Sequence, residues 1–170
     1  MIYYTADTHF GDERILKLCH RPFRTVEDMD EALIRRWNEK VSKSDTVWLL
    51  GDVAVDEETA ARILPKLHGK VHLLLGNHDA VLTDSLRYFE SVSQIKTIED
   101  QGRSVCLCHY PLLSYENSVY GGYHIFGHIH NNPQDIATQI AKTIPRIYNA
   151  GVDECDFSPR SLSELEGELL

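Results

Sequence analysis

Apolar residues occur along this chain in short, nearly continuous runs bounded by polar and turn-forming residues, a pattern typical of strands buried on both faces. The run from Thr46 to Leu50 is the clearest, since every residue after the threonine is apolar. By the same pattern we expect strands at Ile2 to Ala6, Thr46 to Leu50, Val71 to Leu75, Ser91 to Ile98, Ser104 to Cys108, Tyr123 to Phe126 and Arg146 to Ala150.

Helical spacing dominates between some of these runs. A helix is expected from Val26 to Val41, with Thr25 as its N-cap, because its apolar residues recur at intervals of three and four. Further helices are expected at Asp56 to Leu64, around Asp84 to Tyr88, and after the capping box formed by Ser161 and Glu164. Helices alternate with strands early and strands dominate later, so the predicted fold class is α/β, with mixed sheets covered by helices.

The composition adds bounds to this picture. With 42% hydrophobic and 25% charged residues in a chain of 170, one domain covering residues 1–170 is expected. The chain opens directly into a strand and lacks an apolar run of about 18 residues, so we expect a cytoplasmic protein that does not span a membrane. The cysteines form no CxxC pair, and Cys106 and Cys108 resemble small buried hydrophobes.

Net charge limits the class of partner. The value of −9 argues against wrapping of a long nucleic acid, which needs a basic face. It does not exclude an acidic substrate, because divalent cations bound in a cleft would reverse the local field.

Polar, chemically active side chains follow directly after five of the apolar runs. The segments are Asp7-Thr8-His9, Gly51-Asp52, Gly76-Asn77-His78-Asp79, Cys108-His109 and Gly127-His128-Ile129-His130. Sites in open α/β sheets form outside the carboxyl ends of strands, so we expect these groups to converge. Seven candidate ligands exceed one tetrahedral site and suit two ions of higher coordination number: Asp7, His9, Asp52, Asn77, His109, His128 and His130.

Each segment taken alone has a simpler explanation. An aspartate after a strand is often part of a turn or a cap, and Gly76-Asn77 could be a tight turn. His128 and His130 could be core histidines with satisfied hydrogen bonds, as we expect for the remaining histidines, His20, His68, His72 and His124. The joint occurrence of all five segments in this order favours the metal site.

The order DxH, GD, GNHD, H, GHxH resembles that of the calcineurin-like metallophosphoesterases and spans residues 7–130. Two further segments resemble the small, uncapped bacterial and phage members of that family: His20-Arg21-Pro22-Phe23 and Asn149-Ala150-Gly151-Val152-Asp153. The resemblance implies a mixed β-sheet sandwich flanked by helices, with the metal site at the carboxyl ends of strands. It also implies two divalent metal ions, drawn from Mn, Fe, Zn, Ni or Co.

Roles follow from the resemblance residue by residue. One metal would take Asp7, His9, Asp52 and His130; Asp52 would bridge to a second metal, which would also take Asn77, His109 and His128. His78 would be catalytic without binding metal, by protonating the leaving oxygen or stabilising the transition state. The implied reaction is hydrolysis of a phosphoester, more readily a diester, by attack of a metal-bound hydroxide.

Substrate contacts are less well defined by the sequence. Many relatives carry a second aspartate three positions after the bridging one, followed by an arginine, whereas here Val55 stands at that position and no arginine follows. The loops Phe10 to Arg24 and Pro111 to Gly122 flank the motifs and are candidates for the substrate rim. Candidate substrate contacts within or beside them are Arg14, Arg21, Arg24, Tyr115, Tyr120 and Tyr123.

Other functions compete with hydrolysis of a small diester, among them metal storage or sensing, which would not call for a histidine beside the site. A phosphomonoesterase or a nuclease would use the same site, although the negative net charge of the chain and the lack of a DNA-docking domain argue against a nuclease. A catalytically silent binding scaffold on this fold would be expected to have lost the catalytic histidine or several ligands, and all are present. The expected partner is therefore a small, nucleotide-like phosphoester.

Overall fold

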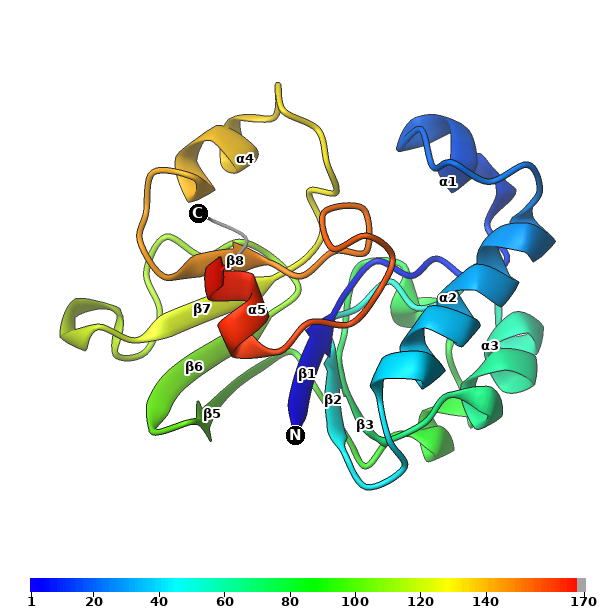
Figure 1. Cartoon of the computed structure of the whole chain (residues 1–170), viewed down its shortest axis with the longest axis horizontal. Coiled ribbons are helices and arrows are strands. Elements are labelled where there is room, and N and C mark those ends of the chain that lie inside the picture. Colours follow the sequence, from blue (N-terminus) through cyan, green and yellow to red (C-terminus); the bar gives the residue numbers. More distant parts are fainter. Residues whose placement is uncertain (168–170) are drawn as a thin grey trace.

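Two four-stranded sheets form the centre of the structure, a computed structural model that describes residues 1–167 (Figure 1). The first sheet is parallel and has the order β1 (Ile2–Thr5), β2 (Thr46–Leu49), β3 (Lys70–Leu74), β4 (Ser91–Ser93). The second has the order β5 (Ile95–Asp100), β6 (Arg103–Cys108), β7 (Tyr123–Phe126), β8 (Ile147–Asn149), with β5 antiparallel to β6 and the other pairs parallel. The fold is therefore α/β, as the sequence predicts.

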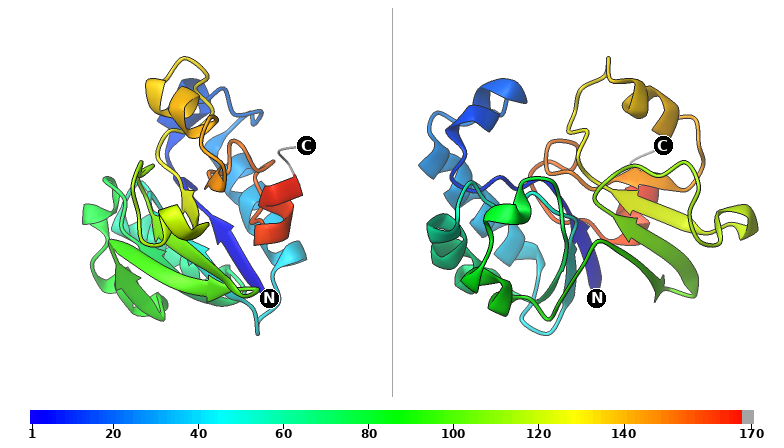
Figure 2. Two further views of the ribbon diagram at one scale, coloured as in Figure 1. Left: turned by 90° about the vertical axis from the view of Figure 1, so that its left-hand side faces the viewer. Right: turned by 180° about the vertical axis from the view of Figure 1, so that it is seen from behind.

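Helices lie at the outside of the two sheets. They are α1 (Glu13–Leu18), α2 (Val26–Lys40), α3 (Glu57–Ile63), α4 (Ile136–Ala141) and α5 (Leu162–Gly167), with short 3-10 turns at Leu64–Lys66, Asp79–Val81, Asp84–Tyr88 and Ser118–Tyr120. Helices α2 and α3 cover the outer face of the first sheet, and α4 lies beside β8 (Figures 1 and 2). No helix among residues 1–167 is long and apolar enough to cross a membrane.

The first sheet is buried on both faces, which explains its continuous apolar runs. Val47 and Leu49 of β2 point into a core shared with the helices. Trp48 and Leu50 point the other way, into a second core shared with Leu107 and other residues of the second sheet. Because successive side chains of a strand alternate between faces, one strand supplies both cores.

Most expected elements are confirmed. Helix α2 begins after Thr25, whose side chain accepts the N–H of Asp28, and Ser161 and Glu164 form the expected capping box before α5. The single strand expected at 91–98 is wrong, because the chain leaves the first sheet after β4 and enters the second as β5. Helices α1 and α4 were not expected; both begin at an aspartate cap and have six residues, too few to establish a helical period.

Candidate metal centre

The exits of β1 and β2 are joined by main-chain hydrogen bonds. The N–H of Asp7 donates to the carbonyl oxygen of Gly51 at 3.0 Å, and the N–H of His9 donates to that of Asp52 at 3.0 Å. These bonds extend the parallel pairing beyond the strands and hold two of the predicted ligand segments side by side. Main-chain hydrogen bonds therefore already bring together two of the ligand segments expected to converge at the carboxyl ends of the strands.

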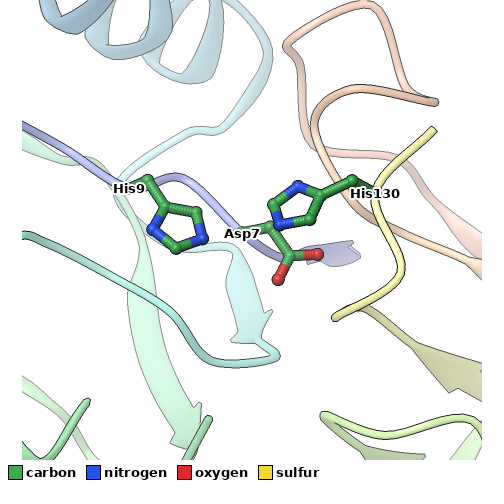
Figure 3. Close-up of side chains that lie close together, drawn as sticks. All are labelled: Asp7, His9 and His130. Atoms are coloured by element: carbon green, nitrogen blue, oxygen red, sulfur yellow. The ribbon is translucent and has the colours of Figure 1, made fainter. Parts of the chain in front are cut away.

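One group of candidate ligands consists of Asp7, His9 and His130, whose ligand atoms lie within 4.8 Å of one another. Figure 3 shows the three side chains, with the Asp7 carboxylate below the ring of His130 and the ring of His9 to the left of both. The two imidazole rings have centroids 5.3 Å apart. A carboxylate and two imidazoles are suitable ligands for Mn, Fe, Zn, Ni or Co.

A second group consists of Asp52, His109 and His128, again within 4.8 Å. Asn77 belongs to this second group, because Oδ1 of Asn77 lies 3.0 Å from Nε2 of His109. The same nitrogen of His109 lies 3.2 Å from Nδ1 of His128. All seven predicted metal ligands are thus brought together in two neighbouring groups.

Asp52 lies between the groups. Its Oδ2 is 3.6 Å from Nε2 of His9 in the first group and 3.6 Å from Nε2 of His109 in the second. This carboxylate oxygen is therefore equally distant from one imidazole of each group.

Five of the candidate ligands have left-handed backbone conformations. Their φ angles are 57° for Asp7, 47° for His9, 56° for Asp52, 72° for His128 and 48° for His130. Residues other than glycine seldom adopt this conformation, and such strain is concentrated at functional sites. The strand exits are bent so that each of these side chains turns toward the shared centre.

Burial makes the centre electrostatically unbalanced. Burial raises the pKa of Asp7 to about 6, although the nearby imidazoles of His130 and His109 oppose this. Burial lowers the pKa of His9 to about 4, and its Nε2 is buried with no hydrogen-bond partner among the described residues. Among those residues no lysine or arginine pairs with Asp7 or Asp52. Buried carboxylates and an unpartnered imidazole nitrogen are the environment that bound cations would satisfy, so the residues fit the implied metals.

His78 lies at the edge of this centre. Its ring is exposed and stands edge-on to that of His9, with centroids 5.3 Å apart, while its main-chain N–H donates to Oδ1 of Asp52. It belongs to neither ligand group. Its predicted role as a catalytic residue that does not bind metal stays a prediction.

Two hollows border the centre. One, of about 600 Å³, is lined by residues of α1, by His128 and His130 and by residues 131–135. The other, of about 570 Å³, is lined by Gly76, Ile95 and Tyr110 among other residues. The first hollow is lined by two candidate ligands, whereas the second is lined by chain neighbours of Asn77 and His109 and by no candidate ligand.

Two predicted substrate contacts are corrected by the structure. The side chain of Arg21 has no exposed surface and forms a bidentate ion pair with Asp153, so it cannot meet a substrate. Tyr123 is a buried residue of β7 whose hydroxyl donates to Glu166. Arg14 is exposed and paired with Asp12, and its role stays a prediction.

Sequence reasoning missed or left open two residues at the site. Tyr110 follows His109 at the end of β6, and its ring contacts those of His109 and His128 at centroid distances of 4.9 and 4.7 Å. Asp153 accepts a hydrogen bond from the ring of His130 at 2.8 Å. The signal for Tyr110 was its position directly after a ligand at a strand exit.

The chain is similar in sequence to the uncharacterized protein MJ1445 of Methanocaldococcus jannaschii, with 34% identity over 164 residues that cover 95% of this chain and 86% of that protein. The chain belongs to the family of this protein. No family model matches the chain.

Solved structures extend the comparison. The protein of unknown function AQ665 from Aquifex aeolicus has a TM-score of 0.77 and 27% identity, with 98% of each chain covered. Nuclease MPE of Pseudomonas putida has a TM-score of 0.49 and 18% identity, with 76% of this chain and 61% of that one covered.

Proposed function

We propose that this protein is a metal-dependent phosphoesterase with two divalent cations at the shared centre. The observation that carries the proposal is the position of Asp52, whose Oδ2 is equally distant from an imidazole of each ligand group, at 3.6 Å. Two cations held there would clamp the phosphoryl oxygens and lower the pKa of a water molecule for attack. The resemblance of the motif order to calcineurin-like metallophosphoesterases supports the same reaction.

Different residues would bind the two cations and transfer the proton. Asp7, His9 and His130 would hold one cation, Asn77, His109 and His128 the other, with Asp52 shared between them. His78, which is exposed at the edge of the centre, would hold a proton near the leaving oxygen. No covalent intermediate with the protein is required.

A diester is the preferred substrate in this proposal. The hollow beside His128 and His130 and the hollow beside Gly76 and Tyr110 would each receive one substituent of the phosphorus. A monoester has one organic arm and would use only one of them. A small, nucleotide-like diester is the class we propose.

The test is turnover of bis-p-nitrophenyl phosphate and p-nitrophenyl phosphate after reconstitution with Mn²⁺. We expect chelator-sensitive hydrolysis, faster on the diester. His78→Ala should lose most activity, by about 10²-fold or more, while still binding two ions per chain. Loss of an ion together with activity would make His78 a ligand, and full metal occupancy without turnover of any phosphoester would favour a binding scaffold.

A further inference from the structure

A fully buried ion pair lies directly behind the candidate metal centre. Nε and Nη2 of Arg21 donate to the two carboxylate oxygens of Asp153 at 2.8 and 2.9 Å. The side chains of these residues are 0% and 1% exposed. A buried charge pair costs desolvation energy, and apolar residues of similar volume often serve stability as well, so its presence calls for another explanation.

The same guanidinium holds the exit of β1. It donates to the carbonyl oxygens of Asp7 at 2.7 Å and Thr8 at 2.9 Å. Asp7 and His9, the ligands on either side of Thr8, are therefore fixed to the segment that carries Asp153, 132 residues from Arg21 along the chain. Planar guanidinium groups suit such multiple, directional contacts.

The Asp153 carboxylate continues the chain of contacts to a ligand. Its Oδ2 accepts a hydrogen bond from Nδ1 of His130 at 2.8 Å, which leaves Nε2 as the nitrogen for a cation. Arg21, which donates to both oxygens of this carboxylate, thus holds it in place against the imidazole.

We propose that Arg21 and Asp153 are positioning residues, which fix the tautomer and orientation of His130 and so set the affinity of the Asp7, His9 and His130 group for its cation. The proposal deepens the proposed function, and it rests only on that function's claim that a cation binds there.

A third group of candidate metal ligands includes two of these residues. Cys19, His130 and Asp153 also lie within 4.8 Å of one another and could form a third, thiolate-containing metal group. However, both oxygens of Asp153 already accept hydrogen bonds from Arg21, so a cation placed there would face the guanidinium at close range. The geometry favours support of His130 over a third site.

The experiment is calorimetric titration of the metal-free full-length protein with Mn²⁺. In Asp153→Asn we expect the affinity for one of two ions to fall about 10- to 100-fold, with the other changed little. Cys19→Ser, which removes the neighbouring thiol, should bind both ions as the unaltered protein does. Unaltered affinities in Asp153→Asn would overturn the proposal, and so would loss of an ion in Cys19→Ser.

Asp153→Asn leaves Arg21 without its partner charge and could fail to fold. The double variant Arg21→Met, Asp153→Asn removes the buried pair and should show the same selective loss of affinity. A measurement on the unaltered Zn²⁺-loaded protein needs no variant: ¹⁵N correlation spectra of the imidazoles should place the His130 proton on Nδ1. A proton on Nε2 would contradict the proposal. A protein with the expected affinities and tautomer but without phosphoester turnover would keep this inference and lose the proposed function.

Discussion

The buried carboxylate of Asp79 accepts the main-chain N–H of Asp52 at 2.9 Å. It also accepts the N–H of Val53 at 2.8 Å and that of Gly76 at 2.8 Å. One side chain from the Gly-Asn-His-Asp segment therefore ties the exit of β2 to the exit of β3. These exits carry Asp52 and Asn77, two candidate ligands of the second group, so Asp79 fixes their separation.

Replacing Asp79 by Asn should be strongly destabilising. An amide is uncharged and presents one oxygen and one NH₂ group, so all three N–H donors would lose a charged acceptor and at least one would face another donor. We expect the free energy of unfolding to fall by about 3 kcal/mol, measured by urea denaturation. Asp56→Asn is the control, because the exposed Asp56 caps α3 by accepting the N–H of Thr59 through one oxygen, which asparagine also offers, so this substitution should cost less than about 1 kcal/mol. Equal stability of the two variants would contradict this role of Asp79.

Gly51 allows a close approach of backbones at the centre. Its φ is +88°, and a Cβ added there would lie 2.5 Å from the nitrogen of Gly76 and 2.7 Å from Nδ1 of His109. Gly102 has a similar φ of +74° but no atom within 4 Å of such a Cβ. Gly102→Ala should therefore cost only the left-handed strain of about 1–2 kcal/mol. Gly51→Ala should cost several kcal/mol more in urea denaturation and should weaken Mn²⁺ binding; similar losses in both would show that space at Gly51 does not matter.

The strands, the main helix and the convergence of ligands could be predicted because they depend on local pattern. The continuous apolar run of β2 and the residue after it predicts burial on both faces, and all four of its apolar residues are buried: Val47, Trp48, Leu49 and Leu50. The ligand segments were found because each follows such a run, and parallel strands bring their carboxyl ends to one edge. The candidate ligands at the strand ends could therefore be predicted without knowledge of tertiary contacts.

Other features depend on contacts between distant residues. Arg21 has the chemistry of a phosphate-binding residue. Its burial depends on its ion pair with Asp153, which lies 132 residues away along the chain and could not be inferred from local sequence. Tyr123 lies in an apolar strand next to paired glycines, and its hydroxyl finds Glu166 only in the folded chain. The division of 91–98 between two sheets likewise follows from packing, since no glycine or proline interrupts the segment.

His124 should make the stability of the protein depend on pH. Burial lowers its pKa, and its Nε2 accepts the N–H of Leu112 at 3.0 Å while Nδ1 lies 2.9 Å from the carbonyl oxygen of Cys106. Protonation of Nε2 would remove that acceptor. Because the unfolded state binds the proton more readily, this contribution leaves stability unaffected above the unfolded pKa of about 6.5 and reduces it as pH falls from there toward the lowered pKa.

The measurement is the free energy of unfolding in the presence of a chelator, from pH 8 down to 5, for the unaltered protein and His124→Gln. The difference between the two should change by at most about 1.4 kcal/mol per pH unit, with the unaltered protein losing more stability on acidification. Other histidines titrate in both proteins and cancel in this difference. Parallel curves would show that His124 is not the responsible group.

Tyr110 should contribute to substrate affinity at the proposed centre. Its ring is 42% exposed and contacts the rings of His109 and His128, and it lines the hollow that also contains Gly76. An aromatic arm of a diester could pack on it, so Tyr110→Ala should raise KM for bis-p-nitrophenyl phosphate about 2- to 10-fold with a smaller change in kcat. Tyr110→Phe keeps the ring and should behave like the unaltered protein. Tyr120→Ala is the matched control, because Tyr120 is 87% exposed in the neighbouring loop; an equal rise in KM there would show that the effect is not specific to Tyr110.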